Sequence, residues 1–436
     1  MMRTRCRLIP IAFAALCAAV VSSEADGAAR ASRESSLSKP SENKGKTGTY
    51  QVKTSRDGCN YFVCVPKSYS EANPAGLHVY FHGQNGQNGA GGFGQWSAPF
   101  LERFNLIGIN MQYMDGDNGK DTGGKTDAAA EAIQQVMADY KIIPRRGVAC
   151  SFSGGGLPHG GLVGKFCKRS SNLPSPFVHQ ALYGSNFFAR AGASIPMSWF
   201  IGLGSEEWNM GMPTLGTTQP ARFIELISET AKGGPRDVYL KITKGKGHSI
   251  SAQDVADSAE QFRRADLAYC GFLYAADYRE AELKSIVASA NKLNLGSAAA
   301  AIDRLLASSS LSEELKTKAA GVKSKIDKRI DAVVALAAEL AQNDPVLCTY
   351  YGPTLLKQLT GHAKLADANK AIAEARKDKR FSTSMALYAS FAKTAGNFFN
   401  GPSLDAGAVP MLQKAKEVAG EKSLLGKMAA EFLMLQ

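Results

Sequence analysis

The sequence changes character once along its length, and this change limits the folds open to it. From residue 49 to about residue 270, short runs rich in β-branched and aromatic residues alternate with helical stretches. That alternation is typical of a mostly parallel sheet covered by helices. From about residue 271 onward, Ala, Leu, Lys and Glu dominate, apolar residues recur three and four positions apart, and no strand is predicted. We therefore expect an α/β domain over 49–270 and a separate all-helical domain over 271–436.

Eight strands are predicted in the α/β part, at residues 50–54, 60–66, 77–81, 106–111, 147–151, 177–183, 198–203 and 238–243. Because only residues 55–58 join the first two strands, we expect an antiparallel hairpin that leads into a parallel sheet. Helices are expected at 127–140, 220–231 and 252–268. Breaks at Gly and Pro divide the C-terminal region into about seven or eight helices, of which 311–343 is one long helix or two.

The N-terminus has the pattern of an export signal. Three arginines precede an apolar stretch of 14 residues, 8–21, and the small residues Ser23 and Ala25 follow at the two positions that a signal peptidase reads. Since a membrane-spanning helix needs about 20 apolar residues, a membrane anchor is the less favoured alternative. We expect residues 1–25 to be a signal peptide and the mature chain to be secreted or periplasmic, without stable membrane insertion. Residues 26–48 have almost no large apolar side chain, which predicts a disordered linker.

The charge of the chain does not favour a nucleic-acid partner. The sequence has 51 Lys and Arg against 39 Asp and Glu, a net charge of +12, but aromatic residues make up only 8%. The basic residues are dispersed and do not form a stripe. We therefore expect no binding to nucleic acid.

The cysteines allow disulfides without specifying them. Eight cysteines are present, six of them after the predicted signal peptide, and export would permit pairing. Cys59 and Cys64 are five positions apart in one predicted strand, so their side chains should point to opposite faces and not pair with each other.

The strongest motif is Ser151-Phe152-Ser153-Gly154-Gly155, which follows a buried strand and precedes a helix. A serine at a sharp strand-to-helix turn has an exposed Oγ, and the next backbone N–H points toward a developing oxyanion. The motif predicts Ser153 as nucleophile and Gly154 as an oxyanion donor. Ser151 stands where the G-x-S-x-G pattern has glycine, so a side chain must fit there. The alternative, a glycine-rich phosphate loop, lacks the required Gly and Lys spacing.

A histidine is needed to activate such a serine, and His248 follows the predicted strand 238–243 in a Gly-flanked turn. We predict His248 as the general base, with a lone surface histidine as the alternative. His159 is expected to point away on the helix after the serine, and His179 lies in a strand. His82 precedes the nucleophile, at the end of a strand, and is interpreted as a structural residue that shapes the loop after it.

The acid that orients the histidine should follow the strand at 198–203. This strand ends at Gly204 and is followed by two carboxylates, Glu206 and Glu207. The common spacing places the acid three residues after the glycine, which favours Glu207, and Glu206 stays open. Asp237 is less favoured because it begins a strand. A buried carboxylate here would accept the His248 Nδ1–H and stabilise the imidazolium.

In chain order the serine, the acid and the histidine each follow the end of a predicted strand. With the His82-Gly83 loop and Gly247-His248-Ser249, the chain resembles the α/β-hydrolase superfamily. It looks most like the secreted esterases that include polyhydroxybutyrate depolymerases and feruloyl or acetyl-xylan esterases. The resemblance covers about residues 50–268 and implies an α/β-hydrolase sheet, with the Gln84 N–H as the second oxyanion donor. It says nothing about the helical region.

Aromatic residues fall on loops or strand ends near the predicted site, at Phe93, Trp96, Tyr113, Phe152 and Trp208. We predict Phe152 and Trp208 as substrate contacts, since such rings stack on sugars or aromatic acyl groups, although each is as compatible with the core. The acidic loop 115–121 does not fit a calcium loop, because Lys120 stands where glycine is required. No metal or cofactor is predicted.

These observations predict an exported serine hydrolase that acts on small or polymeric carboxylic esters. A serine peptidase on the same fold is the nearest alternative. A catalytically inactive hydrolase fold that binds an unidentified protein partner through its helical region is the other.

Overall fold

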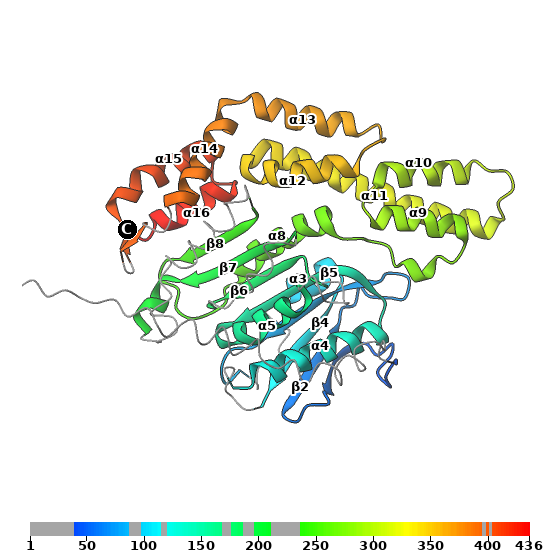
Figure 1. The fold of residues 1–436 in the computed structure, drawn as a ribbon, viewed down its shortest axis with the longest axis horizontal. Coiled ribbons are helices and arrows are strands. Elements are labelled where there is room, and N and C mark those ends of the chain that lie inside the picture. The colour runs from blue at the N-terminus through cyan, green and yellow to red at the C-terminus, as the bar shows by residue number, and fades with distance from the viewer. Residues whose placement is uncertain are drawn as a thin grey trace, which may run out of the picture.

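The computed structural model describes residues 39–86, 97–114, 120–167, 176–185, 196–210, 236–394, 398–400 and 403–436. In this part of the chain, an eight-stranded sheet carries helices on its faces, and a group of helices follows it along one side (Figure 1). The predicted fold class is confirmed: an eight-stranded, mostly parallel α/β sheet is followed by a helical C-terminal region. The predicted signal peptide and the predicted helix at 220–231 lie outside the described residues.

The strands are β1 (Gly48–Lys53), β2 (Cys59–Val65), β3 (Ala75–Phe81), β4 (Leu106–Tyr113), β5 (Ile142–Phe152), β6 (His179–Tyr183), β7 (Ser198–Gly204) and β8 (Val238–Thr243). Their order in the sheet is β1-β2-β4-β3-β5-β6-β7-β8. As predicted, β1 and β2 form an antiparallel hairpin, and β2 is also antiparallel to β4. All other neighbours are parallel. The loops that follow β3 and β5–β8 therefore gather at one edge of the sheet, where α/β folds bind ligands.

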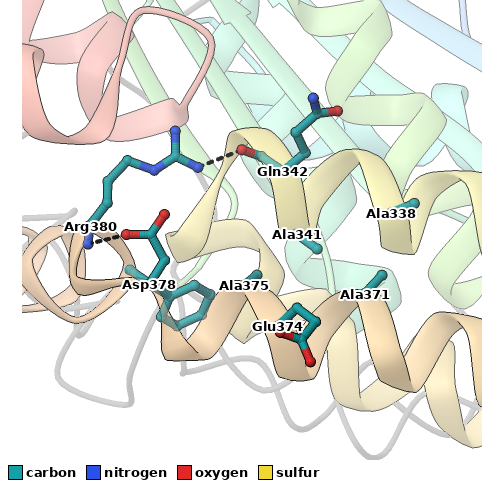
Figure 2. A pocket seen from close by; sticks show the side chains of 9 residues that line it. Ala338, Ala341, Gln342, Ala371, Glu374, Ala375, Asp378 and Arg380 are labelled. Atoms are coloured by element: carbon teal, nitrogen blue, oxygen red, sulfur yellow. Dashed lines mark hydrogen bonds between the residues drawn. The ribbon is translucent and has the colours of Figure 1, made fainter.

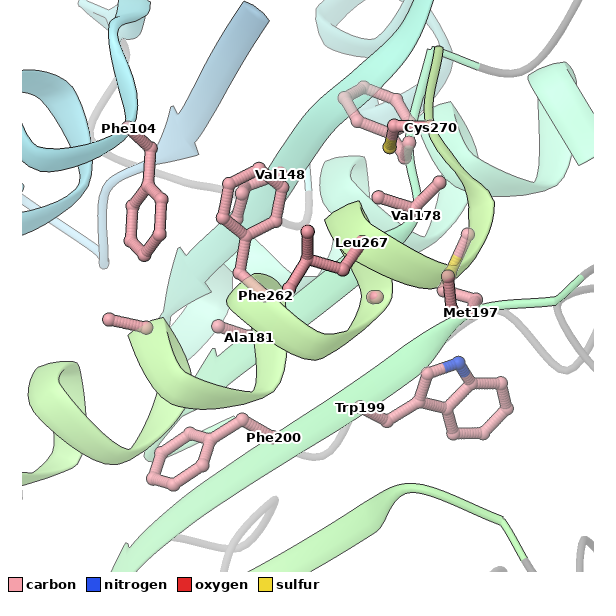
Figure 3. Close-up of a cluster of buried hydrophobic side chains, with 14 of the residues drawn as sticks. Phe104, Val148, Val178, Ala181, Met197, Trp199, Phe200, Phe262, Leu267 and Cys270 are labelled. Atoms are coloured by element: carbon pink, nitrogen blue, oxygen red, sulfur yellow. The ribbon is translucent and has the colours of Figure 1, made fainter. Parts of the chain in front are cut away.

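Most of the sheet is covered on both faces, which is why β3, β4, β6 and β7 are continuous buried runs. On one face, Ser151 of β5 contacts α5 (Gly156–Cys167) through His159. On the other, His179 of β6 contacts Ser258 of α8 (Ala252–Tyr269). On this second face, Phe262 of α8 lies over the sheet near Val148 and Ala181 (Figure 3).

Two other helices complete the α/β part. The short helix α3 (Ala98–Phe104) lies beside α8, where Phe104 packs edge-on against Phe262 at 5.0 Å between ring centroids. Helix α4 (Thr122–Asp139) packs against α5 and starts five residues earlier than predicted. Its N-terminus is capped by the Asp121 side chain, which accepts the Gly124 N–H and pairs with Arg56. The glycines of this first turn conceal the helical pattern in the sequence.

The described end of the predicted linker, residues 39–48, contacts the body of the protein. Ser41 donates its backbone N–H and its hydroxyl to the Asp139 carboxylate, at 2.6 and 2.7 Å. The Tyr140 hydroxyl donates to the Lys46 carbonyl at 2.7 Å. These residues therefore form a turn on α4 that leads into β1.

Strand β2 alternates between buried and half-buried residues, so Cys59 and Cys64 lie on opposite faces, as predicted. In the described part of the chain, Cys64, Cys150, Cys270 and Cys348 are thiols.

The C-terminal helices are α9 (Ala281–Asn291), α10 (Leu295–Leu306), α11 (Glu313–Asn343), α12 (Pro345–Gln358), α13 (Leu365–Lys377), α14 (Lys379–Thr394), α15 (Val409–Ala419) and α16 (Leu424–Leu433). The stretch for which one or two helices were expected is the single helix α11. A two-stranded ribbon, β9 (Phe399–Asn400) and β10 (Ser403–Leu404), was not predicted. Among the described residues, no helix has the length and apolar character needed to cross a membrane.

The helical region packs along α8 and the edge strand β8 (Figure 1). Buried polar contacts cross this interface. The Tyr351 hydroxyl donates to the Asp237 carboxylate at 2.8 Å, and the Gln358 amide donates to the carbonyls of Leu267 and Ala268 at 3.1 Å. Since unpaired polar groups are costly to bury, these bonds fix how the helices lie on the sheet.

Candidate active site

Ser153 occupies a strained turn directly after β5. Its φ is +52°, a left-handed conformation that non-glycine residues adopt rarely, and it begins the 3₁₀ turn η3 (Ser153–Gly155) that leads into α5. Gly155 permits the turn, because a Cβ there would lie 2.5 Å from the His82 carbonyl oxygen. The Ser153 side chain is partly exposed at the edge of the sheet where the loops gather. This is the geometry that a nucleophile elbow requires.

Ser151 fits at the glycine position of the motif because it has a partner. Its buried hydroxyl lies 2.9 Å from Nδ1 of His159, which α5 presents to the core. Burial lowers the pKa of His159 to about 3, so this imidazole is neutral. His159 therefore supports the turn from beneath, a contact that the sequence did not predict.

The loop after β3 lies against the serine turn. A Cβ on Gly83 would lie 3.1 Å from the Ser153 Cβ and 3.0 Å from the Phe152 ring. His82 is buried, accepts the Tyr113 N–H on Nε2 at 3.2 Å, and donates from Nδ1 to the Gly83 carbonyl at 2.5 Å. His82 thus shapes the loop, as interpreted from the sequence. Gln84 follows as an exposed residue in the turn after Gly83, next to the Ser153 turn.

The carboxylate of Glu207 contacts the imidazole of His248. Glu207 is only 3% exposed; its Oε2 lies 3.0 Å from His248 Nδ1, and its Oε1 accepts the Gly204 N–H at 2.7 Å. Glu206 is exposed and instead donates its backbone N–H to the Lys246 carbonyl at 3.0 Å. Asp237 lies at the opposite end of β8 from the His248 loop. The structure therefore brings Glu207, and neither of the other acids, to His248.

Because Nδ1 faces Glu207, Nε2 of His248 points the other way. Nε2 is buried and has no hydrogen-bond partner in the described part of the chain. The Phe152 ring stacks on the imidazole at 4.6 Å between centroids. Phe152 and Tyr183 are paired at the ends of the neighbouring parallel strands β5 and β6. Ser153 and Gly184 are the next residues, so they follow these two strand ends side by side. The His248 ring lies beside both strand ends, because it stacks on Phe152 and lies 2.8 Å from where a Cβ on Gly184 would be.

Gly184 makes room for the His248 ring, and no motif in the sequence marks it. Its φ is +54°, and a Cβ there would lie 2.8 Å from the imidazole ring and 3.3 Å from Glu207 Oε2. Its N–H donates to the Gly202 carbonyl at 2.8 Å. The only signal in the sequence is a glycine immediately after a predicted strand.

The other predicted contacts are placed as follows. Phe152 lies against His248, whereas Trp208 belongs to the 3₁₀ turn η5 (Ser205–Met210) and its side chain is outside the described structure. Tyr113 is fully buried beside His82, so it is a core residue. Phe93, Trp96 and most of the acidic loop lie outside the described residues.

A hollow of about 290 Å³ lies elsewhere, between α11, α13 and the start of α14 (Figure 2). Alanines line it together with a few polar residues, and Arg380 crosses one end by donating to the Gln342 carbonyl at 2.6 Å. No predicted site residue contributes to it.

No family model and no curated protein matches the sequence. Among solved structures, an acetyl xylan esterase from Aspergillus awamori is 15% identical, with a TM-score of 0.37; the match covers 50% of this chain and 99% of that one. Esterase 2 from Thermogutta terrifontis, phosphorylated by paraoxon, is 16% identical, with a TM-score of 0.36 and coverage of 52% and 95%. S-formylglutathione hydrolase (FrmB) from Staphylococcus aureus is 11% identical, with a TM-score of 0.35 and coverage of 50% and 98%. This is a low-identity structural resemblance to esterases, and it carries no argument about activity.

Proposed function

We propose that this chain is an exported serine hydrolase that cleaves carboxylic esters. Ser153 is the nucleophile, His248 the general base and Glu207 the acid that orients it. The observation that carries the proposal is the Glu207–His248 pair, which leaves the buried Nε2 of the imidazole without a hydrogen-bond partner in the described part of the chain. The imidazole stacks on Phe152, the residue directly before the strained Ser153 turn. The N–H groups of Gly154 and Gln84 are the proposed oxyanion donors.

In the proposed reaction, Ser153 Oγ attacks the ester carbonyl carbon while His248 Nε2 takes the hydroxyl proton. The carbonyl oxygen becomes an oxyanion, which the two backbone N–H groups stabilise. When the oxyanion collapses, the C–O bond to the alcohol breaks and His248 returns the proton to the leaving oxygen. Water, deprotonated by His248, then attacks the acyl-serine. The bond to Ser153 Oγ breaks, His248 returns the proton to Oγ, and the carboxylic acid is released. Throughout, Glu207 accepts the Nδ1–H and stabilises the imidazolium.

Phe152 and Trp208 are the proposed contacts for the acyl or alcohol group. The Phe152 ring already covers one face of the imidazole, which gives the site an apolar wall. Such a wall suits a small aryl or alkyl ester, or one unit of a polymeric ester, better than a charged substrate.

Hydrolysis of a short-chain aryl ester tests the proposal. We expect turnover that falls by about 10³-fold or more in Ser153→Ala, because the covalent step is lost while only the hydroxyl is removed. The control is Ser309→Ala, an exposed serine of the helical region, which should keep the wild-type rate. Equal rates in wild type and Ser153→Ala would remove Ser153 from the mechanism.

The same assay separates the alternatives. An amide of the same acyl group that is cleaved faster than the ester would favour a serine peptidase. A folded protein that cleaves neither would favour the binding-module interpretation and overturn the proposal. Export is tested by sequencing the N-terminus of the mature protein, which should begin at Asp26; an intact N-terminus would contradict it.

A further inference from the structure

A buried carboxylate lies beneath the loop that carries His248. Asp254 is in the first turn of α8 and is fully buried. Its Oδ2 accepts the Lys246 ammonium at 2.5 Å and the Ser251 backbone N–H at 3.0 Å. Its Oδ1 lies 3.5 Å from Lys241 Nζ. Asp254 therefore binds the chain on both sides of His248, two residues before it and three residues after it.

This arrangement exceeds what a helix cap needs. In a capping box, the acid at this position bonds only the backbone N–H of the N-cap residue, here Ser251. Asp254 makes that bond and also faces two lysines whose side chains are only 6% and 9% exposed. Buried ion pairs are a weak source of stability, because the desolvation of the charges offsets their attraction. The cluster therefore calls for an explanation other than stability.

The Lys246 contact has a direct geometric consequence for the proposed site. Gly245 and Gly247 flank Lys246, so the backbone of this loop has little intrinsic rigidity. The Lys246 carbonyl accepts the Glu206 N–H, which ties the loop to the turn that carries Glu207. Its side chain ties the same residue to α8. Lys246 thus links the loop at 244–251, which carries His248, both to the turn η5, which carries Glu207, and to helix α8.

We propose that Asp254 is a positioning residue for His248. By holding Lys246 and Ser251, it fixes the loop between them so that the imidazole stays aligned between Glu207 and Ser153. This inference rests on the proposed function. Asp254 does not touch the reacting atoms and acts only through the loop.

The test compares Asp254→Asn with Asp257→Asn, which lies one turn further along α8. Asp257 accepts hydrogen bonds from Lys241 at 2.7 Å and from Gln253 at 3.2 Å. Among the described residues, no hydrogen bond or ion pair joins its side chain to the loop at 244–251, so it is the matched control. Asparagine at position 254 can still accept the Ser251 N–H, but it loses the charge that holds Lys246. We expect kcat for an aryl ester to fall by about 10- to 100-fold in Asp254→Asn at unchanged KM. In Asp257→Asn, kcat should stay within about twofold.

A second variant covers the case in which Asp254→Asn does not fold. Lys246→Met removes the same contact and leaves Asp254 paired with Lys241, and it should lower kcat by a similar factor at unchanged KM. In the double variant the losses should not add, since both changes break one contact. A kcat within twofold of wild type in the folded single variants would overturn the proposal. So would equal losses in Asp254→Asn and Asp257→Asn.

Failure of the proposed function would look different. If wild type cleaves no ester, hydrogen exchange of the backbone at residues 244–251 still tests the role of Asp254. Faster exchange there in Asp254→Asn than in Asp257→Asn would support positioning of the loop. Equal exchange in the two variants would contradict it.

Discussion

Glu207 divides its carboxylate between two donors, the Gly204 N–H and the His248 imidazole. A glutamine at this position has one acceptor oxygen for two donors, and it lacks the charge that stabilises an imidazolium. We therefore expect Glu207→Gln to lower kcat by about 10²- to 10⁴-fold, measured with an aryl ester. The exposed neighbour provides the control: Glu206→Gln should stay within about twofold. A larger loss in Glu206→Gln than in Glu207→Gln would show that the acid is misassigned.

Gly184 leaves the space that His248 occupies. A methyl group there would meet the imidazole at 2.8 Å, and its φ of +54° disfavours any side chain. Gly184→Ala should displace His248, lowering kcat by at least about tenfold, and should destabilise the fold by about 1–2 kcal/mol. Gly123→Ala is the control, because nothing lies near its Cβ position, and it should be neutral or stabilising by up to about 1 kcal/mol. Full activity in Gly184→Ala would contradict the placement of the histidine.

At the residue scale, the sequence could indicate only those residues of the proposed site that a local pattern marks. Ser153, Glu207 and His248 each follow a strand in a recognisable turn. Gly184 and the Ser151–His159 contact depend on which strands and helices become neighbours, and no local pattern encodes that. Tyr113 was left open between substrate contact and core; it is a core residue, and no local pattern at a strand end decides between the two.

At the scale of the elements, helix α16 packs against β8, which is one of the two edge strands of the sheet. The unpaired backbone groups of an exposed edge strand can pair with a strand of another chain. In β8, a side chain of α16 occupies one of these backbone groups. Glu431 of α16 accepts the Ile242 N–H at 3.1 Å and the Tyr239 hydroxyl at 2.8 Å. Burial raises the pKa of Glu431 to about 7 from its usual 4.5.

This raised pKa makes stability depend on pH. Between about pH 4.5 and pH 7 the folded state holds a proton that the unfolded state has released, so stability falls as the pH rises through this window. Each unit of pKa shift corresponds to about 1.4 kcal/mol. In Glu431→Gln this contribution is absent. Urea unfolding at several pH values should show wild type losing stability relative to the variant as the pH rises from 4.5 to 7. A difference that does not change with pH would contradict the assignment.

The elements themselves were largely predictable, and the exceptions have identifiable causes. The buried strands are continuous apolar runs, so the sequence marks them clearly. The start of α4 was missed because glycines occupy its first turn. The sequence did not decide whether residues 311–343 form one helix or two, because the helical periodicity runs through the whole stretch and its length also suits two helices. The β9–β10 ribbon has strands of only two residues, too short for any periodicity.

At the scale of the whole molecule, the helical region and the sheet share a buried interface. The Asp237 carboxylate lies directly before β8. It accepts hydrogen bonds from the Arg264 guanidinium of α8 and from the Tyr351 hydroxyl of α12. The sequence predicted both regions but not their docking, since Asp237 and Tyr351 lie 114 positions apart. The interface predicts that the two regions unfold together.

Tyr351→Phe tests this coupling. Removing the hydroxyl takes one donor from a buried carboxylate, so we expect a loss of about 1–3 kcal/mol. The tryptophans all lie before residue 270 and report on the α/β part, whereas far-UV circular dichroism is dominated by the helices. Both signals should give one transition, shifted by the same amount in the variant. Separate transitions, with only the helical signal shifted, would show that the two regions are independent.

The central claim is that Ser153 is an activated nucleophile, and labelling with a fluorophosphonate tests it most directly. Only a serine with an adjacent base reacts quickly with this reagent. After brief exposure of the purified protein without residues 1–25, mass spectrometry of its peptides should find a single adduct on Ser153, and His248→Ala should abolish it. A folded protein that forms no adduct, or forms it on another serine, would contradict the account.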